Sequence, residues 1–160
     1  MRNNFLSMEA LEDRLRYWQS KLRLMDWQVE IMFERGYNLG ADIGRIHIFE
    51  DKRRALIRMT EANDWDPANL LPYDMEQVVV HELLHIHFYP LTRDAGSNVT
   101  AEEQAIEAIS WALVSLDRRA DEVENYYLQE LERRPYGLLP RPAVVNCYAG
   151  RGEGGTHDNT

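Results

Sequence analysis

Cysteine and long apolar runs are scarce in this chain of 160 residues. Cys147 is the only cysteine, which excludes an internal disulfide and favours a reducing setting. The first residues lead into a charged segment instead of an apolar signal sequence, so we expect a cytoplasmic protein. No apolar run approaches the roughly 20 residues that a membrane-spanning helix needs, so we expect no membrane partner.

Positive charge is also scarce. The formal net charge is −9, and lysine occurs only at positions 21 and 52. Such a charge disfavours sequence-independent binding to the phosphate backbone of nucleic acids. What the chain does contain is 44% hydrophobic and 28% charged residues, which is typical of a globular protein. The length is that of a single domain, which we place at residues 1–145.

Proline and glycine are absent between positions 100 and 134. This segment predicts one long helix, or two in succession with a break near positions 117–121. Pro135 and the residues after it end the helix. Residues 146–160 are rich in glycine and polar side chains, so we expect a disordered tail.

Hydrophobic periodicity predicts the remaining elements. They are a helix over 7–25, strands over 27–33, 41–49 and 55–59, a loop at 36–40, and a helix that Asp74 caps and that ends near Pro90. Closely spaced strands joined by short polar turns are expected to pair antiparallel. The predicted fold class is therefore α+β, with a small three-stranded antiparallel sheet packed on helices.

The predicted helix after Asp74 contains the motif His81-Glu82-Leu83-Leu84-His85. Residues four apart on a helix share a face, so His81 and His85 can both reach one zinc ion. Glu82 lies beside them, where its carboxylate can take a proton from a metal-activated water. The alternative is a pair of half-buried histidines without a metal, but burying them beside a glutamate without a partner would be costly.

This motif, on an apolar helix after a small sheet, resembles the zincin metallopeptidases, and the likeness in architecture extends over about residues 7–116. The chain is similar to compact members such as the ImmA/IrrE family, to minimal gluzincins, and to metallopeptidase-like proteins carried by phages. The resemblance implies a zincin-like fold, a Zn²⁺ cofactor and a peptide or protein substrate. Phe88 and Leu91 stand where metzincins have glycine and histidine, so that subgroup does not fit.

A catalytic zinc ion requires a third protein ligand. The resemblance to gluzincins implies a glutamate from the next helix, where the candidates are Glu102, Glu103 and Glu107. We favour Glu103, because Glu107 then lies one turn on, where gluzincins place a carboxylate that orients a ligand histidine. The alternative for Glu103 is a capping box with Thr100. The inward face of this helix is predicted to consist of Ile106, Ile109, Leu113 and Leu116.

The sequence leaves open which group stabilises the oxyanion of the transition state. The candidates are Tyr73, Tyr89, Tyr126, Tyr127 and several arginines. The leading hypothesis is a zinc metallopeptidase, with His81, His85 and Glu103 as metal ligands and Glu82 as the general base. The second hypothesis is a zincin-like module that binds zinc and a protein partner without hydrolysis. The third is a structural domain without a metal.

Overall fold

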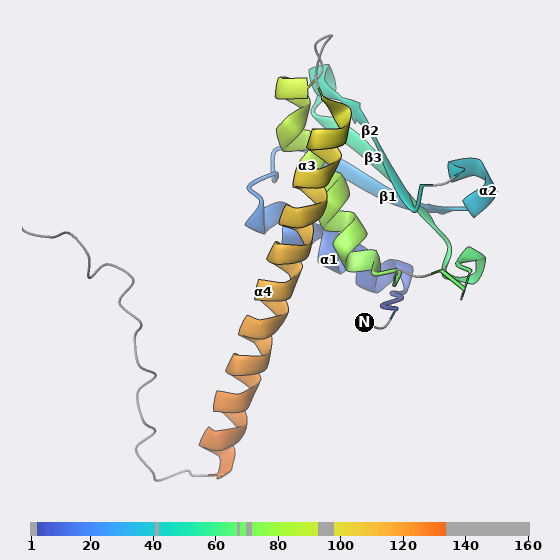
Figure 1. Ribbon diagram of the computed structural model, residues 1–160. Coiled ribbons are helices and arrows are strands. Elements are labelled where there is room, and N and C mark those ends of the chain that lie inside the picture. The colour runs from blue at the N-terminus through green and yellow to red at the C-terminus, as the bar shows by residue number, and fades with distance from the viewer. Residues whose placement is uncertain (1–2, 41, 67, 70–71, 93–97, 134–160) are drawn as a thin grey trace, which may run out of the picture. The chain divides into compact units, whose positions relative to one another are not determined.

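A computed structural model describes residues 3–40, 42–66, 68–69, 72–92 and 98–133 of the chain. Its architecture is α+β, with a three-stranded sheet and helices (Figure 1). The strands are β1 (Gln28–Glu34), β2 (Gly44–Phe49) and β3 (Arg54–Thr60), and the spatial order is β1-β3-β2. The central strand β3 has the most buried residues, as a strand with two neighbours should.

The sheet is mixed, so the prediction of an antiparallel sheet was wrong. β2 and β3 pair antiparallel, but β1 and β3 pair parallel. The chain leaves β1 through the short helix α2 (Gly36–Leu39), at the position where we expected a loop, and enters β2 at the far edge. β3 then returns between the two earlier strands. Short connections favour antiparallel pairing only between strands that are adjacent in the sheet. β1 and β2 are not adjacent, because β3 lies between them.

Helix α1 (Met8–Lys21) forms the predicted amphipathic element. The hydroxyl of Ser7 accepts a hydrogen bond from the backbone N–H of Ala10 at 3.3 Å, which caps the first turn. Arg23 adopts a left-handed conformation with φ of 57°, so the helix ends before the predicted position 25. Leu11, Leu15 and Trp18 recur at helical spacing and are buried in the core.

Helix α3 (Met75–Thr92) packs against β2, β3 and α1. Because neighbours contact it on several sides, apolar residues around much of its circumference are buried. They include Val78, Val79, Val80 and Leu83, which join one core cluster with residues of α1 and β3. Pro90 lies within the last turn, and the helix continues for two residues beyond the predicted end.

Helix α4 (Val99–Arg133) is one continuous helix, as the first of the two predictions for this segment had it. The chain divides into two units, Met1–Asp121 and Glu122–Thr160, and the boundary lies within α4. The first unit contains the sheet, the core and all residues of the candidate site. The described part of the second unit is the final segment of α4. The predicted domain end at residue 145 and the predicted tail at 146–160 lie outside the described residues.

The inward face of α4 differs from the prediction. Ile106 and Val114 are buried, but Ile109 is 39% and Leu116 is 62% exposed. The position between the two buried residues is Ser110, whose hydroxyl accepts a hydrogen bond from the amide of Gln77 at 2.9 Å. Hydrophobic periodicity missed this face because part of it is polar. In the described part of the chain, every helix is too short or too polar to cross a membrane.

Candidate metal centre

The first turn of α3 fixes the position of the motif. The Asp74 carboxylate accepts a hydrogen bond from the backbone N–H of Gln77 at 3.2 Å, which confirms Asp74 as the N-cap. The Gln77 side chain does not complete a capping box, because it donates to Glu107 and Ser110 on α4 instead. The cap therefore fixes the residue at which α3 begins, and the side-chain hydrogen bonds of Gln77 connect α3 to α4.

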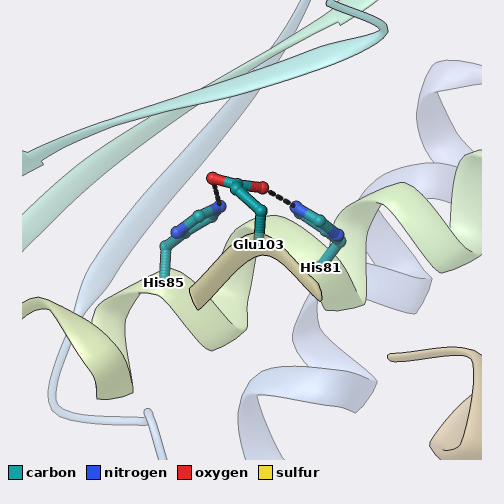
Figure 2. Close-up of side chains that lie close together, drawn as sticks. All are labelled: His81, His85 and Glu103. Carbon is teal, nitrogen blue, oxygen red and sulfur yellow. Dashed lines mark hydrogen bonds and ion pairs between the residues drawn. The ribbon is translucent and has the colours of Figure 1, made fainter. Parts of the chain in front are cut away.

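His81, His85 and Glu103 converge between α3 and α4 (Figure 2). One ligand atom from each of the three residues lies within 4.8 Å of the others. Glu103 directs one carboxylate oxygen at His81 Nε2, at 3.3 Å, and the other at His85 Nε2, at 3.6 Å. Atoms bound to one tetrahedral zinc at 2.0–2.1 Å lie about 3.3 Å apart. Each nitrogen–oxygen distance approaches this value with a different carboxylate oxygen, so a small movement of the side chains would bring one oxygen and both nitrogens to a common ion.

The other two candidate glutamates contact the opposite nitrogens of the same rings. Glu107 lies 3.1 Å from His81 Nδ1, and Glu102 lies 3.5 Å from His85 Nδ1. Glu107 also accepts a hydrogen bond from the Trp111 indole at 2.8 Å. A carboxylate at Nδ1 fixes the orientation of an imidazole and leaves Nε2 free to bind a metal. Glu107 and Glu102 thus each face one Nδ1 atom, and Glu103 lies between the two Nε2 atoms.

The capping-box alternative for Glu103 does not fit the start of α4. The helix begins at Val99, and Asn98 caps it by accepting a hydrogen bond from the backbone N–H of Ala101 at 3.1 Å. Thr100 therefore lies inside the first turn instead of at the cap, and Glu103 lies beyond the position that a capping box uses. Glu103 is 49% exposed on the side that opens into the cavity described below.

Glu82 is 5% exposed and lies between α3 and β2. Burial raises the pKa of its carboxyl group to about 8, and the negative charges of Glu103 and Asp42 add to this, while a hydrogen bond from the backbone of Ile46 opposes it. A Cβ atom at Gly44 would lie 2.5 Å from Val78 Cγ1 and 2.7 Å from a Glu82 carboxylate oxygen, so a side chain there would force both residues to move. Gly44 therefore gives Glu82 room to approach the strand, which no sequence motif indicated.

These residues line a cavity of about 520 Å³ between α3, α4 and β2. The strand β2 is an edge of the sheet. Ile43 O accepts a hydrogen bond from Thr60 N at 3.0 Å, so the backbone groups of Gly44, Ile46 and Ile48 point away from β3, in the alternation of an antiparallel pair. Among the described residues no further strand pairs with this outer edge of β2, which borders the cavity.

Of the tyrosines considered from the sequence, Tyr89 lines this cavity. It lies one turn after His85 on α3. Tyr73 is fully buried and donates its hydroxyl to Thr60 O at 2.7 Å, so it belongs to the core. Tyr126 and Tyr127 belong to the second unit. Within the first unit, the structure thus separates Tyr89 from Tyr73, which the sequence could not distinguish.

The two other described histidines lie away from the centre. His87 is exposed and lies 3.0 Å from Leu22 O, at the end of α1. His47 is exposed on β2.

The donor set fits a zinc ion. Two imidazoles and a carboxylate are the ligands that catalytic zinc sites use, and burial lowers the pKa of His85, which favours the neutral ring that binds a metal. Four carboxylates, those of Glu82, Glu102, Glu103 and Glu107, gather around two imidazoles. A divalent cation would neutralise part of this negative charge. The chain matches no protein-family model, and neither a curated protein nor a solved structure matches it.

Proposed function

We propose that the chain is a zinc-dependent hydrolase of peptide bonds. The observation that carries this proposal is the position of the Glu103 carboxylate between the Nε2 atoms of His81 and His85. These three residues would hold the ion, and Glu107 and Glu102 would orient the two rings from Nδ1. When bound, zinc supplies Lewis acidity, which polarises the scissile carbonyl and lowers the pKa of a water ligand to about 7.

Glu82 is the general base in this proposal. Its carboxylate borders the same cavity as the three ligands, and it takes the proton of the attacking water and then delivers it to the leaving amine. The charge of a bound cation favours the ionised form of Glu82, which offsets the effect of burial on its pKa. Tyr89 borders the cavity with a hydroxyl that can donate a hydrogen bond to the developing oxyanion.

The free edge of β2 provides a place for the substrate. An extended peptide can add to this edge by main-chain hydrogen bonds with the backbone groups of Gly44 and Ile48 and with the carbonyl of Ile46, whose N–H donates to Glu82 instead. Because Ile46 N–H also contacts Glu82, a peptide bound there lies next to the proposed base. Main-chain binding of this kind would present an extended internal segment of a substrate to the centre, as an endopeptidase requires.

The test combines zinc analysis with the substitution Glu82→Gln. Protein purified without added metal is expected to contain one zinc ion per chain, and to cleave a mixed library of quenched fluorescent peptides. Glu82→Gln should retain the zinc and lose hydrolysis, because the amide cannot accept the proton of water. Glu30→Gln, at an exposed position on β1, is the matched control and should retain both.

Each part of the proposal has its own contradicting result. Hydrolysis that survives in Glu82→Gln would reject the mechanism. Zinc that is absent, and that does not bind on addition, would reject the metal centre. Zinc binding without hydrolysis of any library peptide would favour the alternative, a zincin-like module that binds zinc and a protein partner.

A further inference from the structure

A second cavity, of about 400 Å³, lies next to the cavity of the candidate metal centre. Its walls come from α2, from the residues that lead into β2, and from the segment that follows β3. Helix α2 lies at the end of the sheet where β2 begins (Figure 1). Asp42 and Ile43 line both cavities, so the two adjoin each other. We call the second one the α2 cavity.

The α2 cavity lies on the path of a peptide that adds to the outer edge of β2. Asp42 precedes Gly44, the first residue of β2, by two positions. An extended chain advances about 3.3 Å per residue, so a bound peptide reaches the α2 cavity two or three residues beyond the one opposite Gly44. Glu82 accepts a hydrogen bond from Ile46 N–H, on the other side of Gly44. A substrate side chain in the α2 cavity therefore lies at a fixed distance from the proposed base.

Two carboxylates that line the α2 cavity each use only one oxygen in contacts with the protein. Nε and Nη2 of Arg45 both contact Oδ2 of Asp42, at 3.2 and 2.5 Å. Oδ2 of Asp64 lies 3.0 Å from Arg35 Nε and accepts a hydrogen bond from Gly36 N–H at 2.9 Å. Within the described residues, neither Oδ1 atom has a hydrogen bond or an ion pair. Both Oδ1 atoms can therefore accept a hydrogen bond from a ligand.

The charges around the α2 cavity favour a cation as that ligand. Arg35 is shared by two carboxylates, because its Nη1 also lies 3.6 Å from Glu61 Oε2. The carboxylates of Asp42, Glu61 and Asp64 outnumber the guanidinium groups of Arg35 and Arg45 by one. A positively charged group would balance this excess and form charge-assisted hydrogen bonds, whereas a negatively charged group would be repelled.

Two aromatic side chains also line the α2 cavity. Trp65 packs against the buried Tyr73, with ring centroids 5.1 Å apart. Tyr37 is 79% exposed, although it belongs to a helix that the buried Leu39 attaches to the core. Aromatic rings attract cations and cover the methylene groups of arginine and lysine side chains. The α2 cavity thus combines carboxylate oxygens for a charged end with aromatic rings for an apolar stem.

We infer that the α2 cavity is a substrate subsite for a basic side chain, that of arginine or lysine. Asp42 and Asp64 accept hydrogen bonds from its charged end, and Tyr37 covers its stem. The inference rests on the proposed function for the path of the peptide along β2. It adds the class of substrate, which is a peptide segment with a basic residue at a fixed distance from the cleaved bond.

Hydrolysis of matched peptides tests this subsite. In a peptide that the full chain cleaves, each position in turn is made arginine, glutamine or glutamate. At one position, kcat/KM for arginine should exceed that for glutamine by roughly tenfold or more, because hydrogen bonds between charged groups are stronger than those with a neutral amide. Glutamate at that position should give a lower kcat/KM than glutamine.

Variants of the α2 cavity assign this preference to its walls. Asp42→Asn and Tyr37→Ala should each lower the ratio of kcat/KM for arginine to that for glutamine. The ratio is the proper measure, because an effect of Asp42 on Glu82 changes both values alike. Asp51→Asn and Phe49→Ala are the matched controls and should keep the ratio, since both residues are exposed and lie outside both cavities.

Peptide binding separates the subsite from hydrolysis. A labelled alanine-rich peptide with one central arginine should bind the wild-type protein and Glu82→Gln more tightly than the same peptide with glutamine, as measured by fluorescence anisotropy. If no peptide is hydrolysed but this difference is present and is lost in Asp42→Asn, the proposed function fails and the subsite stands. Hydrolysis with equal kcat/KM for arginine and glutamine at every position would overturn the subsite alone. A preference for arginine that persists in both Asp42→Asn and Tyr37→Ala would also overturn it.

Discussion

At the scale of single residues, the three glutamates of the candidate centre differ in the histidine nitrogen that each one faces. Glu103 lies between the Nε2 atoms of both rings, whereas Glu107 and Glu102 each lie at one Nδ1 atom. A ligand contributes directly to metal affinity, and a residue that only orients a ligand contributes less. The order of zinc affinities among variants should therefore identify the third ligand.

We predict that Glu103→Gln lowers zinc affinity the most. Glu107→Gln should lower it about 10–100-fold, because it removes the carboxylate that holds His81 in place. Glu102→Gln should have a similar or smaller effect, since its contact with His85 is longer, at 3.5 Å. Competition titration with a chromogenic chelator measures all three. A larger loss in Glu102→Gln or Glu107→Gln than in Glu103→Gln would assign the third ligand to that residue instead.

The same residues show what a sequence can predict about a site. His81, Glu82 and His85 lie on one helix, so their spacing alone brings them to neighbouring positions. Glu103 comes from a different helix, and its distance to the histidines depends on how α4 packs on α3. Gly44 and Ile46 come from a strand and contribute space and a backbone N–H group, which have no sequence signature. The sequence therefore left the choice among the three glutamates open, and the packing favours Glu103 by its position between the two Nε2 atoms.

At the scale of elements, the start of α3 depends on a carboxylate that several groups share. Asp74 accepts hydrogen bonds from Gln77 N, from Asn4 at 3.2 Å, and from two Arg118 nitrogens at 2.7 and 3.0 Å. Burial alone would raise the pKa of Asp74, but the hydrogen bonds from Arg118 and Gln77 outweigh it and lower the pKa. Asp74 thereby links the cap of α3, the N-terminal segment and α4.

We predict that Asp74→Asn destabilises the metal-free protein at neutral pH by about 2 kcal/mol, as expected when hydrogen bonds to a charged group are weakened. The contribution of Asp74 is complete above the pKa of an unfolded aspartate, about 3.9. It is lost as the pH falls through the lower pKa of the folded state. The stability difference between wild type and variant should therefore shrink below about pH 4.

Urea denaturation at a series of pH values, in the presence of chelator, measures this difference. Asp51→Asn is the control, because Asp51 is exposed in the turn between β2 and β3. It should change stability by less than about 0.5 kcal/mol at every pH. A constant difference between wild type and Asp74→Asn over the acid range would contradict the proposed charge effect.

Elements were predicted better than their pairing. Periodicity located β1, β3 and α1 to within a few residues, because each has one buried face. It could not predict the parallel pairing of β1 with β3, which depends on a strand that arrives later in the chain. It also assigned Ile109 and Leu116 to the core, because spacing reveals an apolar row without revealing what the row contacts. The elements follow from local pattern, whereas the pairings depend on the whole fold.

At the scale of the whole first unit, polar contacts attach α4 to the rest of the fold. Arg118 bonds to Asp74 and Glu76, and Asp117 bonds to Arg14 and Tyr17. Near the start of α4, Glu103 contacts the histidines of α3 in the candidate centre. The buried apolar side chains of α4 include Ile106 and Val114. Two charged clusters therefore hold the helix, and one of them contains the proposed zinc ligands.

A metal shared by α3 and α4 should act as a cross-link between them. A ligand that binds only the folded state stabilises it by about 4 kcal/mol at a thousandfold excess over its dissociation constant. We therefore predict that zinc raises the thermal unfolding temperature of the wild-type protein relative to the same protein in chelator. His85→Ala should lose this increase, because it removes a ligand. His47→Ala, at an exposed position on β2, should retain it. Thermal melts followed by circular dichroism measure the shift, and an equal zinc effect in both histidine variants would show that the ion binds elsewhere.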